Sequence, residues 1–195
     1  MRELIKKTVD TPWKAFGEIA MFLFKISAFV SFVIIKKVQL GQGHKFYGLP
    51  KILRHRGSVI EIGDNFENRN RWDSNPLGIN HPTIFCTWLK GAKILIGDDV
   101  GISGGSIVAS KRIEIGDGTL IGANCTIIDT DFHPITSKAR RYGQEAIKSN
   151  PVKIGKNVFI GMDTTMLKGV IIPDDTVIPA GSTVVASKNG GYRLR

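Results

Sequence analysis

The chain has 195 residues, 42% of them hydrophobic, and a formal net charge of +10. This length suits one domain with a buried core plus an appendage. The positive charge is concentrated in residues 1–56, which carry eleven Lys/Arg against three Asp/Glu, whereas residues 57–195 carry sixteen against fourteen. Basic and aromatic residues are not interleaved and no nucleic-acid-binding motif accompanies them, so we expect no nucleic-acid partner.

Cys86 and Cys125 lack metal-ligand spacing, and we expect a reducing, cytoplasmic setting with Cys125 in the core.

The first predicted element is an apolar helix over Ile19–Ile35, interrupted by Lys25 and flanked on both sides by further lysines. Seventeen residues with an internal lysine is at the short limit for spanning a bilayer, and no signal-peptide cleavage pattern follows. The pattern favours a helix on the inner membrane surface, with its lysines against anionic lipid. The alternative is a helix that packs on the rest of the chain or on a partner subunit.

A six-residue repeat follows the basic segment. An early coil is predicted over Ser58–Phe66, and residues 68–89 are interpreted as imperfect coils with a bulge. Further on, aliphatic residues open successive hexads, and the second and fifth positions are mostly small or β-branched; the openers are Ile96, Ile102, Val108, Ile115, Ile121, Ile127, Ile154, Ile160, Met166, Ile172, Ile178 and Val184. A period of six fits neither a helix nor an alternating strand, so each hexad is one flat side of a coil. Three hexads make one turn, and turns stack about 4.8 Å apart.

The repeat has two irregularities. Val108 and Ile115 are seven residues apart, which predicts a bulge around residues 110–112. After Ile127 the next hexad should open at His133, but the repeat resumes only at Ile154. The intervening Phe132–Asn150 is polar and basic, and long loops in compact repeats are usually functional or disordered. We therefore expect a coil domain over residues 57–188 with a functional loop at 132–150, and a short tail at 189–195.

Three motifs carry a resemblance to a known family: Asp129–Pro134 (DTDFHP), Gly78–Pro82 (GINHP) and Gly97–Ser106. With the hexads, they resemble the hexapeptide-repeat acyltransferases, most closely the bacterial sugar O-acetyltransferases of capsule, O-antigen and colanic acid synthesis. The resemblance covers roughly residues 58–188. It implies an all-β left-handed parallel β-helix, here with an N-terminal helical segment and one extruded loop. It also implies a homotrimer with active sites between subunits, acetyl-CoA as the donor and no metal.

The resemblance also implies roles for particular residues. His133 matches the family's general base, and a histidine suits that task because its ordinary pKa is about 6.5. Asp131 stands where a small neutral residue is expected, so its carboxylate either orients the imidazole or caps the turn; Asp129 is the substitute. Acceptor contacts fall on Asn80, His81 and Ser103, for which a structural turn or a small corner residue is the alternative. Acetyl-CoA contacts fall on Phe159, Gly161, Met162, Ala180 and Lys188, although Phe159 stands where relatives often carry tryptophan and could simply pack.

The expected function is O-acetyl transfer from acetyl-CoA to a sugar of a cell-surface polysaccharide or of its lipid-linked precursor, in the cytoplasm or at the inner face of the cytoplasmic membrane. Three alternatives stay open: N-acetyl transfer to an amino sugar or amino acid, a non-catalytic scaffold in glycan assembly, and a metal-dependent hydratase. The hydratase requires three histidine ligands, and the four histidines include no close pair in the coils.

Overall fold

The computed structural model describes residues 38–135, 140, 141, 143 and 147–195. These residues form nineteen short strands and no helix, so none of them offers a helix long and apolar enough to cross a membrane. The predicted helix over Ile19–Ile35 lies outside the described residues.

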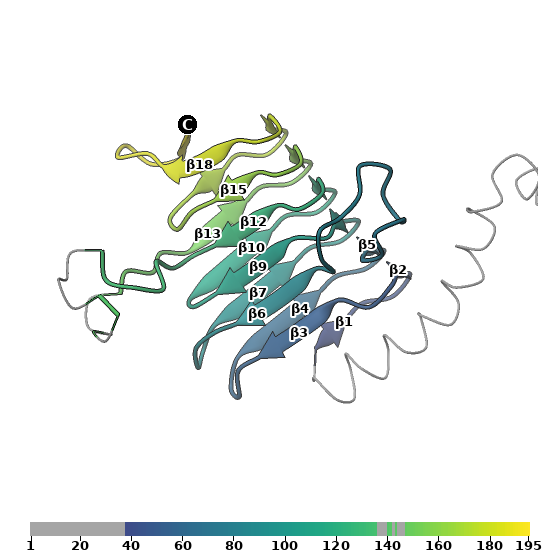
Figure 1. Cartoon of the computed structure of the whole chain (residues 1–195), viewed down its shortest axis with the longest axis horizontal. Coiled ribbons are helices and arrows are strands. Elements are labelled where there is room, and N and C mark those ends of the chain that lie inside the picture. Colours follow the sequence, from purple (N-terminus) through teal and green to yellow (C-terminus); the bar gives the residue numbers. More distant parts are fainter. Residues whose placement is uncertain (1–37, 136–139, 142, 144–146) are drawn as a thin grey trace, which may run out of the picture.

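The strands make three flat faces, each a sheet of stacked, hydrogen-bonded strands (Figure 1). Face A contains β1 (Gln39–Leu40), β4 (Val59–Ile62), β7 (Lys93–Ile96), β10 (Arg112–Ile115), β13 (Val152–Ile154) and β16 (Ile171–Ile172). Face B contains β2 (Lys45–Tyr47), β5 (Glu67–Arg69), β8 (Gly101–Ser103), β11 (Leu120–Ile121), β14 (Phe159–Ile160) and β17 (Val177–Ile178). Face C contains β3 (Lys51–Arg54), β6 (Ile84–Thr87), β9 (Ser106–Ala109), β12 (Thr126–Ile128), β15 (Thr165–Met166), β18 (Thr183–Ala186) and β19 (Tyr192–Leu194).

The chain visits the faces in the order A, B, C, and each coil pairs in parallel with the next. This is the predicted left-handed parallel β-helix, a triangular prism with an A–B, a B–C and a C–A edge. The last strand departs from the pattern, because β19 in the expected tail folds back antiparallel on β18.

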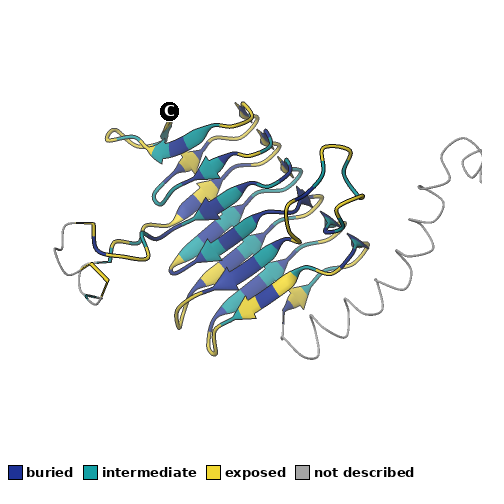
Figure 2. Cartoon of the chain, viewed as in Figure 1, coloured by how far each residue is buried: buried dark blue, intermediate teal, exposed yellow. Residues whose placement is uncertain are grey.

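Aliphatic side chains from all three faces fill the prism, and buried and exposed residues alternate along the strands (Figure 2). The predicted hexad openers are buried, with one exception. On β9 it is Ile107 that points inward, and Val108 is half-buried on the outside. Gly104 and Gly105, with φ of 63° and 92°, turn the chain one residue early. The predicted register was wrong at this coil because both neighbours are aliphatic.

The domain boundary expected at residue 57 is also wrong, because β1, β2 and β3 already form a complete coil of the prism. Aromatic rings fill this end of the core. Phe46, Phe66 and Phe85 are fully buried, with ring centroids 5.9 and 6.2 Å apart in edge-to-face contacts. Phenylalanine does not match an aliphatic hexad, so the repeat could not be followed here.

A second extruded segment, residues 70–83, joins β5 to β6 at the B–C edge, where imperfect coils with a bulge were expected. A buried polar network holds its base. Asn68 points inward and donates to Thr83 Oγ1 (2.8 Å), while Asn70 donates to Asn68 Oδ1 (2.6 Å) and accepts from the Thr83 N–H (2.8 Å). Every polar group here has a partner, which lets asparagine occupy a core position.

Candidate functional site

The long extruded segment leaves the prism at the C–A edge, between β12 and β13 (Figure 1). A narrow neck joins it to the prism. Thr130 and Ser149 form an antiparallel bridge, and the Ser149 hydroxyl donates to Thr130 Oγ1 at 2.8 Å. The Asp131 N–H donates to the carbonyl of Lys148 at 3.1 Å. His133 therefore follows directly after a hydrogen-bonded base.

A tight turn presents His133. Its N–H donates to the carbonyl of Asp131, two residues earlier, at 2.7 Å, and Phe132 between them has a φ of 58°. This γ-turn with positive φ is a strained conformation for a bulky residue, and such strain clusters at functional sites. The His133 side chain is exposed, and its imidazole makes no hydrogen bond within the described residues. The ring is thus held outward on a fixed backbone.

The Asp131 carboxylate lies in a protected position beside this turn. Its side chain is 16% exposed and forms an ion pair with Lys168, whose side chain is 24% exposed. The other oxygen, Oδ2, is buried without a hydrogen-bond partner in the described part of the chain. The carboxylate therefore binds Lys168 rather than the imidazole of His133 in this single chain. Lys168 was missed because it lies 37 residues away in the sequence.

Asp129 has a structural role. Its fully buried carboxylate accepts the N–H groups of Ser110, Lys111 and Arg112 at 2.6, 2.7 and 2.7 Å. Burial raises the pKa of Asp129, and the three backbone donors oppose that rise. The carboxylate closes the corner of the preceding coil where the sequence predicted a bulge, so it is occupied and does not substitute for Asp131.

An aromatic pair lies next to His133. The ring of Trp88, which directly follows β6 on the C–A edge, contacts that of Phe132 edge-on, with centroids 6.0 Å apart and planes at 84°. Trp88 is 57% exposed. The sequence reasoning missed this residue, because nothing in the hexad pattern links the two corners.

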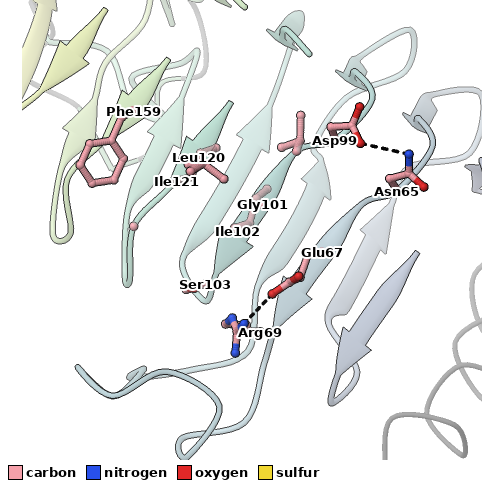
Figure 3. A pocket seen from close by; sticks show the side chains of 12 residues that line it. Asn65, Glu67, Arg69, Asp99, Gly101, Ile102, Ser103, Leu120, Ile121 and Phe159 are labelled. Atoms are coloured by element: carbon pink, nitrogen blue, oxygen red, sulfur yellow. Dashed lines mark hydrogen bonds and ion pairs between the residues drawn. The ribbon is translucent and has the colours of Figure 1, made fainter. Parts of the chain in front are cut away.

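A groove of about 320 Å³ lies on face B (Figure 3). It brings together two expected residues, Ser103 and Phe159, with Leu120 between them on the neighbouring strand. At its far side Arg69 pairs with Glu67 at 2.6 Å. The groove therefore joins an apolar floor to a charged rim, and the rim residues were not predicted because the register of β5 was unknown.

The other expected residues lie on the edges. Asn80 and His81 cross the B–C edge: the Asn80 N–H donates to Asn124 Oδ1 at 2.8 Å, and a Cβ on Gly104 would lie 2.9 Å from the His81 carbonyl oxygen. Also on this edge, in successive coils, are Gly161, Met162 and Ala180. A Cβ on Gly161 would lie only 2.3 Å from the nitrogen of Ala180, so glycine is required there for stacking. Lys188 is separate, in the turn between β18 and β19 at the far end of face C.

The arrangement divides the expected residues into two groups. In a triangular prism, face B lies opposite the C–A edge, so the groove and His133 face in opposite directions. One chain alone does not unite them. The residues that the structure describes include no group of three or more His, Cys, Asp or Glu side chains that could hold a metal ion.

Two family models match the coils on either side of the extruded segment. Residues 112–131 match the hexapeptide repeat of succinyl-transferase, and residues 151–186 match the bacterial transferase hexapeptide (six repeats). The chain is 40% identical over 79 residues to galactoside O-acetyltransferase of Escherichia coli, covering 40% of this chain and 37% of that protein. It is 40% identical over 143 residues to the bifunctional protein GlmU of Campylobacter fetus, covering 69% of this chain and 28% of that protein.

The chain thus spans about a third of the length of these two relatives. The crystal structure of the polySia-specific acetyltransferase NeuO aligns with 81% of this chain and 84% of that one at 16% identity, with a TM-score of 0.27. The repeat matches and the coiled fold agree with each other. The chain therefore carries the hexapeptide repeat of bacterial transferases over residues 112–131 and 151–186.

Proposed function

We propose that this protein is an acetyltransferase that moves the acetyl group of acetyl-CoA to a sugar hydroxyl, with His133 as general base. The observation that carries this proposal is the exposed imidazole on a strained γ-turn, at the neck of the segment extruded from a hexapeptide-repeat prism. A neutral imidazole can accept a proton on one ring nitrogen and return it later in the reaction, which is what a general base must do.

The reaction needs one proton carrier. The sugar oxygen attacks the thioester carbonyl while its proton passes to the imidazole of His133, and the carbon–sulfur bond then breaks. The leaving thiolate takes the proton back from the imidazolium. Asp131 stabilises the imidazolium if its unpartnered oxygen turns toward the ring, and Lys168 holds the carboxylate in place meanwhile.

The groove on face B is the proposed donor site. The ring of Phe159, half exposed, and Leu120 offer an apolar surface for the pantetheine arm, and the B–C edge at Gly161, Met162 and Ala180 continues it. Because this groove faces away from His133, the site requires a second copy. We therefore include a homotrimer in the proposal, in which His133 of one copy faces the groove of its neighbour.

The acceptor in this proposal is a cell-surface polysaccharide or its lipid-linked precursor, which places the protein in the cytoplasm at the inner face of the membrane. The basic apolar segment 19–35 supports this placement. Removal of residues 1–37 should abolish sedimentation with membranes and preserve acetyl transfer.

The decisive experiment measures acetyl-CoA turnover with a panel of sugars. We expect H133A to lower kcat about 100-fold or more, the usual contribution of a general base. The matched control is H55A, which removes another exposed histidine of the same edge. Unchanged turnover in H133A would refute the assigned base. Hydroxylamine treatment of the product distinguishes a labile O-acetyl ester from the N-acetyl alternative, and absence of turnover with every acceptor would favour the scaffold.

A further inference from the structure

The charges of the prism are sorted by edge. The A–B edge carries six aspartates and one lysine: Asp64, Asp98, Asp99, Asp117, Asp174, Asp175 and Lys156. The described residues of the C–A edge carry eight cations and two carboxylates: Arg56, Lys90, Lys111, Arg140, Arg141, Lys148, Lys168, Lys188, Asp129 and Asp131. Both carboxylates are occupied, one by backbone N–H groups and one by Lys168. The C–A edge is therefore strongly positive.

Part of this edge is a column of cations that leads to His133. The Lys90 stem lies against Gly57, where a Cβ would be 3.5 Å from its Cγ, and Gly57 directly follows Arg56. One coil further, the Lys93 N–H donates to the Lys111 carbonyl at 2.9 Å. The backbone of Lys111 in turn binds Asp129, next to the neck of the extruded segment. Successive coils are about 4.8 Å apart, so the backbone positions that carry these cations are closely spaced.

Three cations of this column have no partner of opposite charge among the residues that the structure describes. Arg56, Lys90 and Lys111 are exposed, and no ion pair joins them to a carboxylate in the part of the chain that the structure describes. A row of unpaired like charges destabilises the fold slightly through repulsion, which an anionic ligand would relieve.

An aromatic surface completes the arrangement. Trp88 lies two residues before Lys90, and its indole is held edge-on by Phe132, the residue before His133. The indole is more than half exposed. An exposed indole face packs well against the C–H face of a sugar ring, because the ring hydrogens are weakly positive and the π-face is negative.

Resting on the acetyl transfer proposed above, we propose that Trp88, Lys90 and Lys111 form an acceptor subsite for an acidic saccharide, a sugar that bears a carboxylate. The sugar ring stacks on Trp88, its carboxylate binds the ammonium groups, and a hydroxyl reaches His133. The cations form a line along one edge, which fits a linear anionic chain better than a flat bilayer. Because the proposed homotrimer brings a neighbour's groove toward His133, the subsite is distinguished from a site for the donor's phosphates by measuring saccharide binding without acetyl-CoA.

Binding without acetyl-CoA tests the subsite independently of catalysis. The probes are uronic-acid oligosaccharides, each compared with its carboxyl-reduced counterpart by calorimetry. We expect the acidic member to bind about five- to tenfold more tightly at about 50 mM NaCl, and this preference to shrink as salt rises. K90Q/K111Q should lose the preference, whereas K45Q/K153Q, which removes two exposed lysines of other faces, should keep it.

Tryptophan variants test the stacking. W88F should weaken binding of both members of each pair, whereas W72F, at the 79%-exposed tryptophan of the other extruded segment, should change neither. Equal affinity for both members across the panel would overturn the subsite. The subsite would also be overturned if K90Q/K111Q raised only the KM for acetyl-CoA. It would be overturned likewise if K90Q/K111Q weakened only the binding to vesicles with about 30% phosphatidylglycerol. A charge preference without acetyl transfer would support the subsite and refute the proposed function.

Discussion

Replacing Asp129 by asparagine tests whether one buried carboxylate closes the irregular coil. Oδ1 of Asp129 accepts the Ser110 N–H, and Oδ2 accepts those of Lys111 and Arg112. An asparagine side chain has one oxygen. In its better orientation this oxygen accepts the N–H groups of Lys111 and Arg112, and the NH₂ group faces the N–H of Ser110. One buried N–H then loses its acceptor, which costs about 1–3 kcal/mol, and the other two bonds lose charge assistance, at about 1 kcal/mol each.

The free energy of unfolding should therefore fall by about 3–5 kcal/mol in D129N. For a chain of this size that lowers the melting temperature by at least about 6 °C, measurable by circular dichroism at fixed protein concentration. The matched control is D131N, two residues away, whose ion pair is partly exposed; it should cost about 1 kcal/mol and act mainly on kcat. A melting temperature of D129N within about 2 °C of the unaltered protein would refute the structural role of this carboxylate.

Two further changes test the turn and the core. F132G should relieve the positive φ of Phe132 but also removes its ring contact with Trp88, so the two effects on the melting temperature oppose each other. It should lower kcat because His133 loses its fixed backbone; an unchanged kcat would contradict the role of the turn. Burial raises the pKa of the Cys125 thiol to about 11 from 9.0, so the folded protein holds this proton more tightly than the unfolded chain. The stabilisation is complete below pH 9 and is lost as pH rises through about 11; pH-dependent unfolding should show this loss in the unaltered protein and not in C125A.

The aliphatic part of the coil could be predicted from the sequence because the hexads from Ile115 onward each place one aliphatic side chain in the prism, and the structure confirms those core positions. The first coil, β1 to β3, was not recognised, and the second was predicted only as an early coil over Ser58–Phe66 followed by imperfect coils. Asn68 occupies an inward position through its own hydrogen-bond network, and the phenylalanine rings replace aliphatic openers. Hydrophobic periodicity has no signal for either substitution.

The site was predictable only where residues are close in sequence. His133 and Asp131 were predicted as site residues because the repeat breaks at them. Lys168 and Trp88 reach the same edge through the stacking of coils, and no local pattern predicts that contact. The opposite placement of the groove and His133 likewise depends on which face each strand occupies, which requires the full register.

The sorting of charge between edges gives the described prism of each copy a transverse electric dipole, perpendicular to the coil axis. In the homotrimer proposed above the three transverse dipoles cancel, so the assembly is not turned as a whole in the field of an anionic polymer. Each cationic edge still attracts such a polymer locally, beside an imidazole of His133, and this attraction fades beyond about 10 Å at 0.1 M salt.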